Sequence, residues 1–339
     1  MRAIVYSENG GADVLRLVDR EPEAPGPGQV RVRVVVSGVN PTDWKTRSGA
    51  TATSSPALSV PNQDGAGVIE SLGSGVTGFA VGDRVWLSMA AHAHPTGGTA
   101  QELTVLPVDR VHPLPEPASF DLGASLGVPA LTAHRALTVG EGMPGRLRPG
   151  SLAGATVLVA GGAGAVGHAA IQLARWAGST VVATVSSAEK AALATAAGAQ
   201  HTVNYRESDA AERIRAVAPE GVDAIVELAI GANLDLDRAV LRTGGAIAVY
   251  ANDGNRPLEF EVRPMMMLNA RLQFVLLYTV PPAALVAGAE DVTAALDALP
   301  VGEAAGLPLH RFPLERTAEA HEAVENGAVG KVLIDVSAG

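Results

Sequence analysis

No part of this chain restricts its architecture as strongly as the stretch from Thr156 to Gly178, TVLVAGGAGAVGHAAIQLARWAG. The apolar run at 157–160 is typical of a strand that is buried on both faces of a parallel sheet. Glycines follow it, and apolar residues then recur at helical spacing until Gly178, where we expect the helix to end. A strand, a glycine turn and a helix in this order predict a site for a dinucleotide.

The glycines of this turn are spaced both as G-x-x-G-x-x-G and as G-x-G-x-x-G. They permit a tight turn and a close approach of the backbone to a pyrophosphate, and the helix that follows directs its free N–H groups there. The alternative is an ordinary turn in an alanine- and glycine-rich protein. The residues that we expect to contact the dinucleotide are Gly161, Gly164, Ala165, Val166 and Gly167.

Beyond this turn, strands and helices alternate up to about residue 250, which favours a right-handed, doubly wound parallel sheet of the Rossmann type. The predicted strands are 156–160, 180–185, 201–204, 223–228 and 245–250, and the predicted helices are 165–177, 188–197, 208–217 and 232–241. We expect a strand within 272–280 to close the sheet, and Met265–Met267 to pack in the core. A helix at 121–137 is expected to be broken at Pro129.

The residues before about 125 form short strand-like runs between turns, a pattern typical of a small β-barrel. The last such run, 330–336, is expected to return to this part of the chain. The predicted organisation is therefore a first domain of residues 1–125, completed by about 285–339, with a nucleotide-binding domain of 126–284 inserted in it. The fold class is α/β, with a β-barrel domain and a Rossmann domain.

Composition excludes several kinds of partner. The chain has 339 residues and a net charge of −10 without a basic patch, which argues against nucleic acid. No apolar run is long and uninterrupted enough to span a membrane. Because there is no cysteine, disulfides and sulfur-ligated zinc are excluded, and a reducing cytosol is the simplest compartment. His92 and His94 form a close pair without a third ligand, so we expect no metal site; His134, His168 and His201 are expected on surfaces.

The end of the second Rossmann strand indicates which dinucleotide binds. NAD-binding folds place an acidic residue there, roughly 20 residues after the glycines, whereas this chain has Ser186 and Ser187. A carboxylate would repel a 2′-phosphate, but two hydroxyls and Lys190 would bind one. Tyr205 and Arg206 follow the third strand and would close the same pocket. The sequence therefore predicts NADPH as the cofactor.

Several motifs occur in a fixed order over nearly the whole chain. They are Gly38-Val-Asn-Pro41, Arg47-Ser-Gly49, Asp64-Gly-Ala-Gly-Val68, Val81-Gly-Asp-Arg-Val85, Gly127-Val-Pro-Ala-Leu-Thr-Ala133, Gly161 to Gly167, Val203-Asn-Tyr-Arg-Glu207 and Gly330-Lys331. In these motifs the chain resembles the zinc-free quinone oxidoreductase (zeta-crystallin-like) branch of the medium-chain dehydrogenase/reductase superfamily. The resemblance implies a GroES-like catalytic domain, a Rossmann domain, a cleft between them, NADPH, and a homodimer or homotetramer.

The resemblance also implies roles for single residues around the cofactor. The matched positions are Thr132 near the nicotinamide half, Ser186, Lys190 and Tyr205 on the 2′-phosphate, Asn252 within the segment 251–254 along the cofactor, and Leu277 at the carboxamide. Lys331 of the last motif is placed among the cofactor-binding residues as well.

Without a metal ion, hydride addition to a quinone or to an electron-poor C=C is easier than reduction of a simple carbonyl, because the charge spreads to a distant oxygen. In the family the 40–47 loop faces the nicotinamide, and here its Asn-Pro-x-Asp-Trp-Lys run resembles plant-type enone and quinone reductases. Lys45 or Asn40 would donate to that oxygen, and Asp43 would orient either one. The alternative is that Asn40 caps the turn and Lys45 is solvated.

An apolar pocket for a flat acceptor is expected beside this loop. Its predicted lining residues are Trp44, Gln63, Asp64, Met89 and Tyr278. For Asp64 the alternative is a structural role, with its carboxylate accepting backbone N–H groups.

These features predict a cytosolic, metal-free, NADPH-dependent reductase of quinones or of α,β-unsaturated carbonyls (enones). One alternative is an enoyl reductase of a biosynthetic intermediate or a thioester. Against the thioester version, residues 49–62 contain no tyrosine to serve as the acid that such enzymes usually carry. The other alternative is a non-catalytic NADPH-binding sensor.

Overall fold

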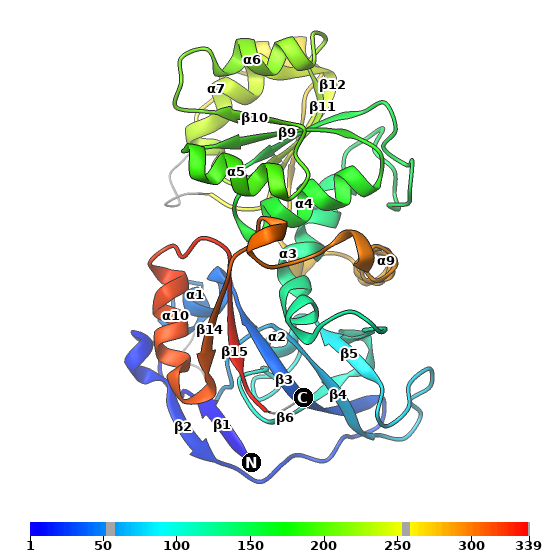
Figure 1. The fold of residues 1–339 in the computed structure, drawn as a ribbon, viewed down its shortest axis with the longest axis vertical. Coiled ribbons are helices and arrows are strands. Elements are labelled where there is room, and N and C mark those ends of the chain that lie inside the picture. The colour runs from blue at the N-terminus through cyan, green and yellow to red at the C-terminus, as the bar shows by residue number, and fades with distance from the viewer. Residues whose placement is uncertain (52–57, 253–257, 338–339) are drawn as a thin grey trace. The chain divides into compact units, whose positions relative to one another are not determined.

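A computed structural model describes residues 1–51, 58–252 and 258–337 (Figure 1). The chain divides into two compact units, each described below by itself. The first unit joins Met1–Val128 to Pro308–Gly339, and the second unit is Pro129–Leu307.

The first unit is built on strands that pair antiparallel, except that β14 pairs with β15 in parallel. Its main sheet has the order β14-β15-β3-β4-β5-β7, with β6 also paired to β3, and β1 and β2 form a separate pair. The strands are β1 (Arg2–Val5), β2 (Arg16–Asp19), β3 (Gln29–Val39), β4 (Asp64–Leu72), β5 (Arg84–Leu87), β6 (Leu103–Pro107), β7 (Val111–Pro113), β14 (Leu309–Pro313) and β15 (Lys331–Asp335), and the helices are α1 (Pro41–Ser48), α2 (Ala90–Ala93) and α10 (Thr317–Glu325). The predicted return of the last strand is confirmed, since β15 pairs with β3.

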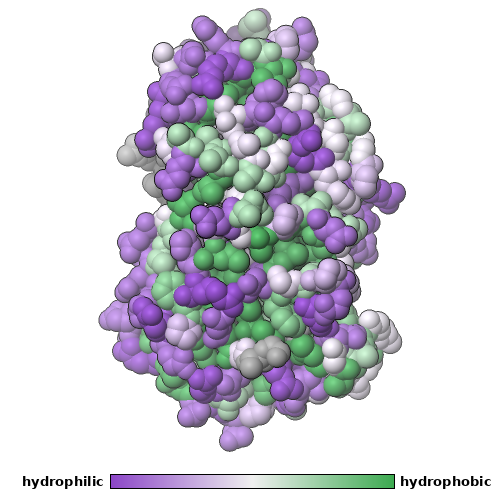
Figure 2. Space-filling view, viewed as in Figure 1, coloured by the Kyte–Doolittle hydropathy of each residue, from purple (hydrophilic) through white to green (hydrophobic). Residues whose placement is uncertain are grey.

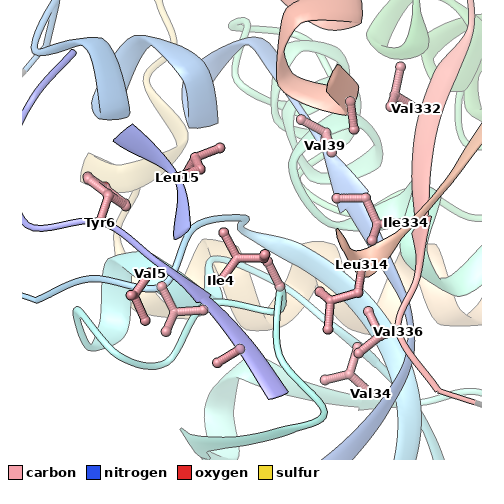
Figure 3. Packing of buried hydrophobic residues seen from close by; sticks show 14 residues of the cluster. Ile4, Val5, Tyr6, Leu15, Val34, Val39, Leu314, Val332, Ile334 and Val336 are labelled. Atoms are coloured by element: carbon pink, nitrogen blue, oxygen red, sulfur yellow. The ribbon is translucent and has the colours of Figure 1, made fainter. Parts of the chain in front are cut away.

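Strand β3 is the centre of this unit because it contributes to a core on each side. Val30 and Val32 pack in one cluster with residues of β4, β5 and β6. Val34 and Val39 pack in the other with residues of β1 and β15, and Figure 3 shows this cluster from close by. The alternating apolar pattern that predicted a half-buried strand thus continues into a strand that is buried along its second half.

The second unit contains the predicted Rossmann sheet. Six parallel strands have the order β10-β9-β8-β11-β12-β13, which confirms the doubly wound arrangement. The strands are β8 (Thr156–Ala160), β9 (Thr180–Val185), β10 (His201–Asn204), β11 (Val222–Glu227), β12 (Leu241–Val249) and β13 (Arg271–Phe274), and the helices are α4 (Ala165–Trp176), α5 (Ala188–Ala196), α6 (Ala210–Val217), α7 (Ile230–Val240), α8 (Val262–Met267) and α9 (Pro282–Ala294). Helix α3 (Phe120–Thr138) carries the chain from the first unit into the second.

Helix α3 corrects the expectation of a break at Pro129, because it continues through this residue. A proline inside a helix lacks the N–H that would bond four residues back. The neighbouring N–H of Val128 is bonded by a side chain instead, since it donates to Asp64 Oδ1 at 2.7 Å. A carboxylate outside the helix therefore supports the helix where its own bonding is interrupted.

Residues 285–307 cluster with the second unit, although the sequence pattern assigned them to the first. Two histidines explain this difference, and both are buried rather than on the surface as expected. His134 Nε2 donates to Asp291 of α9 at 2.8 Å, and His168 Nε2 donates to the carbonyl oxygen of Ala305 at 2.8 Å. His201 is exposed, as predicted.

The expected core position of the methionine run is confirmed only for Met265, which is partly buried against the core of the second unit. Met266 and Met267 at the end of α8 are 60% and 71% exposed. The strand expected within 272–280 ends at Phe274, and Leu277–Thr279 form a short 3-10 helix, η4.

Within the described residues, no helix combines the length and the apolar character needed to cross a membrane. On the face drawn in Figure 2, hydrophilic side chains cover much of the surface and hydrophobic ones gather in patches between them.

Candidate functional site

Three parallel strands of the second unit end side by side. Val159 of β8 pairs with Ala183 of β9, and Val185 of β9 pairs with Asn204 of β10. The carboxyl ends of parallel strands meet at one edge of a sheet, which is where such folds bind ligands. The structure therefore brings together the glycine turn after β8, the serines after β9 and Tyr205 after β10. We call the turn Gly161–Gly167 together with Ser186, Lys190 and Tyr205 the cofactor edge.

Two glycines of the turn are required by the protein itself. Gly161 has a φ of +66°, a left-handed conformation that favours glycine. A Cβ at Gly161 would lie 2.4 Å from Leu228 Cδ2, and a Cβ at Gly167 would lie 2.4 Å from the carbonyl oxygen of Gly161. These two positions allow α4 and the loop after β11 to pack directly against the turn.

Gly164 differs from both, because the protein does not require a glycine there. Its φ of −83° suits any residue, and it is exposed. A Cβ at this position would meet only the carbonyl oxygen of Gly161, at the ordinary contact distance of 3.5 Å. The missing side chain leaves open space beside the first N–H groups of α4, at Ala165, Val166 and Gly167, which lack acceptors within the helix. These residues fit a pyrophosphate.

The other end of the cofactor edge presents side-chain donors. Ser187 caps α5, since its hydroxyl accepts a hydrogen bond from Lys190 N at 3.3 Å. In the described part of the chain, the Ser186 hydroxyl, the Lys190 ammonium and the Tyr205 hydroxyl make no hydrogen bond, and Tyr205 is 41% exposed. One cation and two hydroxyls at an exposed strand end fit a phosphate on the ribose. Ser187 acts as a helix cap in this arrangement.

The remaining predicted cofactor residues lie in separate places. Thr132 is buried in α3, and Leu277 is buried in η4. Asn252 follows β12 and is half-buried, whereas Asp253 and Gly254 of the predicted 251–254 segment lie outside the described residues. Their contacts with a cofactor stay a prediction.

The first unit holds a buried group of polar side chains, which we call the polar cluster: Asn40, Asp43, Asp64 and Lys331. Lys331 Nζ donates to Asn40 Oδ1 at 2.7 Å and to Asp64 Oδ2 at 2.9 Å. Asn40 Nδ2 donates to Asp64 Oδ2 at 2.7 Å. Asn40 follows β3, Asp64 begins β4 and Lys331 begins β15. None of these three residues is more than 2% exposed. Lys331, predicted on the cofactor, instead pairs with Asp64.

Two glycines make room for the polar cluster. A Cβ at Gly127 would lie 2.2 Å from Asp64 Oδ1, the oxygen that accepts the Val128 N–H. A Cβ at Gly38 would lie 3.0 Å from Lys331 Cε and 2.1 Å from the carbonyl oxygen of Ala124. Asp64 therefore explains Gly127, whereas Gly38 is required first by the backbone of α3 and then by the Lys331 side chain. The bonds of Asp64 are those of the structural alternative, in which its carboxylate accepts a backbone N–H.

Asp43 holds the start of α1 in place. Its Oδ2 accepts the N–H of Asn40 at 2.7 Å, and its Oδ1 accepts the N–H of Gln63 at 3.1 Å. Burial, and then the charge of Asp64, raise the pKa of Asp43 to about 8, against the effect of these N–H groups and of Lys331. Asp43 thus accepts hydrogen bonds from the backbone before α1 and from the backbone before β4.

The residues predicted to line an acceptor pocket differ in exposure, and each is described within its own unit. Lys45 and Trp44 are half-buried on α1, and Lys45 Nζ lies 5.7 Å from the centre of the Trp44 ring. Tyr278 in η4 is half-buried too. Gln63 is buried and accepts the N–H of His92 at 3.0 Å. Met89 is 1% exposed, and its sulfur lies 3.2 Å from Arg110 Nη1.

Sequence patterns did not single out a buried carboxyl pair at the end of β11. Glu227 and Asp237 are 0% and 1% exposed. The available signal was an acidic residue directly after an apolar strand run.

No group of three or more histidine, aspartate or glutamate side chains able to hold a metal ion occurs among the residues that the structure describes.

Known proteins share this architecture. Two family models match: Alcohol dehydrogenase GroES-like domain over residues 26–116 and Zinc-binding dehydrogenase over residues 165–298. A quinone oxidoreductase of Rattus norvegicus is 35% identical and covers 98% of this chain and 97% of its own. A mycobacterial protein solved in complex with NADPH is 29% identical, with a TM-score of 0.80 and 98% and 99% coverage. A 2-haloacrylate reductase is 26% identical, with a TM-score of 0.79 over both whole chains.

Proposed function

We propose a function from one premise: the chain belongs to the zinc-free quinone oxidoreductase branch of the medium-chain dehydrogenase/reductase superfamily. We infer that it is an NADPH-dependent reductase that transfers a hydride directly to quinones or to α,β-unsaturated carbonyls. The observation that carries this proposal is the cofactor edge, where Gly164 leaves open space beside the start of α4 and three donors lie at the neighbouring strand ends.

When bound, NADPH supplies the hydride from C4 of its nicotinamide. The protein's contribution is binding and orientation. The N–H groups at the start of α4 hold the pyrophosphate, while Ser186, Lys190 and Tyr205 select the phosphorylated ribose. The chain has no cysteine for a sulfur-ligated metal site, so we propose a reaction in which side chains alone stabilise the charge that forms.

Lys45 is the residue for which we propose a donor role toward the acceptor. Lys45 is partly exposed, and a cation stabilises an oxygen that gains negative charge as a quinone or enone accepts a hydride. Asn40 and Asp43 differ from it, because their polar atoms are engaged in the polar cluster. We propose that these two residues position α1, and thereby Lys45, rather than contact the acceptor.

A steady-state assay tests the proposed activity. NADPH oxidation is followed with 1,4-naphthoquinone, an enone and crotonyl-CoA in parallel. Turnover of the quinone or the enone supports the proposal. Turnover of crotonyl-CoA alone would favour the enoyl reductase alternative, toward which the likeness to a 2-haloacrylate reductase also points. NADPH binding without turnover of any acceptor would favour a sensor.

We further propose that the protein is a homodimer that pairs through β13, or a homotetramer that contains this dimer. Strand β13 is the edge of the six-stranded sheet, and within the described residues no further strand pairs with it. Phe274 and Leu276 at its end, and Val262, Met266 and Met267 in α8, are all exposed. Exposed apolar side chains beside a free strand edge are typical of an interface.

Light scattering on a size-exclusion column tests this assembly. The double variant Phe274→Glu and Met267→Glu places charges at the edge and is expected to be a monomer. The matched control is Val81→Glu in the first unit, where an equally exposed apolar residue is changed far from β13 in the sequence. A monomeric wild-type protein would contradict the proposal.

We also propose a cytosolic location, because the chain lacks cysteine.

A further inference from the structure

The buried carboxyl pair missed by the sequence patterns lies next to the cofactor edge. Val226 of β11 pairs with Val159 of β8, so one and two residues further along, Glu227 and Leu228 lie beside Ala160 and Gly161. Leu228 covers Gly161 so closely that a Cβ there would lie 2.4 Å from its Cδ2. The shape of the loop after β11 therefore limits the position of the glycine turn.

Glu227 sets the shape of this loop. Its Oε1 accepts the N–H of Ala229, which turns the chain directly after the strand. Asn233 of α7 donates to both oxygens of the same carboxyl group, at 3.0 and 3.2 Å. One buried side chain thus fixes residues 228–229 and the first turn of α7 together. An ionised carboxylate also stabilises the N-terminal end of a helix.

Asp237 completes the arrangement two turns along α7. Both carboxyl groups are almost fully buried, Asp237 Oδ2 has no hydrogen-bond donor among the described residues, and Glu227 lies close enough for its charge to raise the pKa of Asp237. Two carboxyl oxygens can share a hydrogen bond only if one of them carries a proton. The pair is therefore stable in this form while it holds one proton and one negative charge.

We propose that the Glu227–Asp237 pair is a positioning device for the cofactor turn, which holds Leu228 against Gly161 and keeps the turn in the form that binds a pyrophosphate. This inference rests on the proposed function for its effect on NADPH. It assigns a role to two residues that do not touch the cofactor edge themselves and act through the loop 228–229.

The charges around the pair predict how it responds to pH. Burial, and then the charge of Glu227, raise the pKa of Asp237 to about 9. Tyr250, which follows β12, is the titratable neighbour from the adjacent strand, and its own pKa is raised by burial and by Glu227. The arginines of α7 and α6 are engaged elsewhere: Arg238 pairs with Asp235, Arg213 pairs with Glu207, and Arg215 donates to the carbonyl oxygen of Ala239.

These contacts determine in which direction a rise in pH changes the loop after β11. The shared proton is retained below a pH of about 9 and is lost above it. Two adjacent buried negative charges repel each other, so Glu227 withdraws from the loop and Leu228 moves away from Gly161. The Asp237→Asn variant carries an amide that donates to Glu227 at every pH, and it therefore mimics the protonated pair without being able to titrate.

The first experiment uses the protein without cofactor, so it does not depend on the proposed function. The methyl signals of Leu228, assigned with Leu228→Ile, are followed by NMR while the pH is raised. We expect them to shift with a midpoint near the pKa of about 9 in the wild type and to stay fixed in Asp237→Asn. Unchanged wild-type signals, or equal shifts in both proteins, would overturn the inference.

The second experiment measures the Kd for NADPH at pH values of about 7.5 and about 10. We expect affinity to fall about tenfold in the wild type and about threefold or less in Asp237→Asn, which cannot lose the shared proton. Asp235→Asn, on the exposed side of α7, is the matched control and should behave as the wild type. An equal fall in wild type and Asp237→Asn would contradict the proposal.

The two experiments separate two kinds of failure. If the Leu228 signals titrate but the protein binds no NADPH at any pH, the proposed function is wrong. The coupling between the carboxyl pair and Leu228 would still stand. Glu227→Gln gives a further test at neutral pH, because its amide removes the negative charge and replaces the second oxygen that accepts from Asn233 with a donor. We expect it to raise the Kd for NADPH about tenfold while circular dichroism shows a folded protein. An unchanged Kd would contradict the role of Glu227.

Discussion

The polar cluster and the cofactor edge are built from similar side chains, and they use them in opposite ways. In the polar cluster, Lys331, Asn40 and Asp64 bond to one another and are hidden from solvent. At the cofactor edge, Ser186 and Lys190 are partly exposed, and among the described residues their hydroxyl and ammonium groups make no hydrogen bond. Buried polar groups must be paired to be stable, whereas groups that serve a ligand have to be left free.

Burial and hydrogen-bond partners distinguish a lysine that supports the fold from one that can bind a cofactor. Both Lys331 and Lys190 were placed on the cofactor by sequence motifs. The structure gives Lys331 two buried partners, while Lys190 is half-exposed next to a helix start. The first therefore supports the fold, and the second stays the candidate for the 2′-phosphate. The predictions below test this division, beginning with the largest expected effect.

Lys331→Met removes the only cation that the structure pairs with Asp64. An uncompensated buried charge typically costs about 3–5 kcal/mol, and we expect the free energy of unfolding in urea to fall by about this amount. Lys190→Ala is the matched control, since surface changes usually stay within about 0.5 kcal/mol. A similar loss in both variants would break the distinction between the two lysines.

Asp43 makes the polar cluster sensitive to pH. Its folded pKa of about 8 lies above the ordinary value of 3.8, so the folded protein holds this proton more tightly than the unfolded chain. The stabilising contribution is full below pH 3.8 and is lost as the pH rises toward 8, with a slope of at most about 1.4 kcal/mol per pH unit. Denaturation curves at several pH values should show this slope in the wild type and not in Asp43→Asn.

Gly164→Ala and Gly167→Ala separate the needs of the ligand from those of the fold. Alanine at 164 meets nothing closer than 3.5 Å, whereas at 167 it meets a carbonyl oxygen at 2.4 Å. We expect Gly164→Ala to weaken NADPH binding about tenfold, roughly 1.4 kcal/mol, with a melting temperature close to the wild type. Gly167→Ala should lower the melting temperature. Unchanged NADPH affinity in Gly164→Ala would mean that the pyrophosphate lies elsewhere.

Lys190→Ala tests the selection of the phosphorylated cofactor. We expect the KM for NADPH to rise about tenfold, as for the loss of a charge-assisted hydrogen bond, and the KM for NADH to stay unchanged. Tyr205→Phe, which removes only a hydroxyl from the same place, should show the same preference more weakly. Equal effects on both coenzymes would remove Lys190 from the phosphate site.

Lys45→Ala has the smallest expected effect. A donor to the acceptor oxygen should lower kcat with an enone several-fold, or about 1 kcal/mol, while the Kd for NADPH is retained. Lys45→Arg keeps the charge and should restore part of the rate. An unchanged kcat would make Lys45 a solvated surface residue, which was the alternative reading of the sequence.

Local patterns were sufficient to predict the Rossmann sheet. The strand, turn and helix around Gly161 are encoded within about two dozen consecutive residues, and the serines after β9 follow from strand spacing. The pattern of β3 predicted a strand that enters a core, and β3 does contribute to two. In these cases the signal lies in residues that are neighbours in the sequence.

The errors concern contacts between distant residues. Lys331 and Asp64 are 267 positions apart, and no spacing rule predicts that they pair. His134 was expected on a surface because its partner, Asp291, lies 157 positions away. Met267 was expected in the core, because a short apolar run does not tell whether another segment of the chain covers it.

The most direct test of the account is the ratio of two affinities. The wild-type protein is titrated with NADPH and with NADH under the same conditions, and each Kd is measured by calorimetry. We predict that NADPH binds at least about tenfold more tightly, because Ser186, Lys190 and Tyr205 engage a 2′-phosphate that NADH lacks. Equal affinities, or tighter binding of NADH, would contradict it.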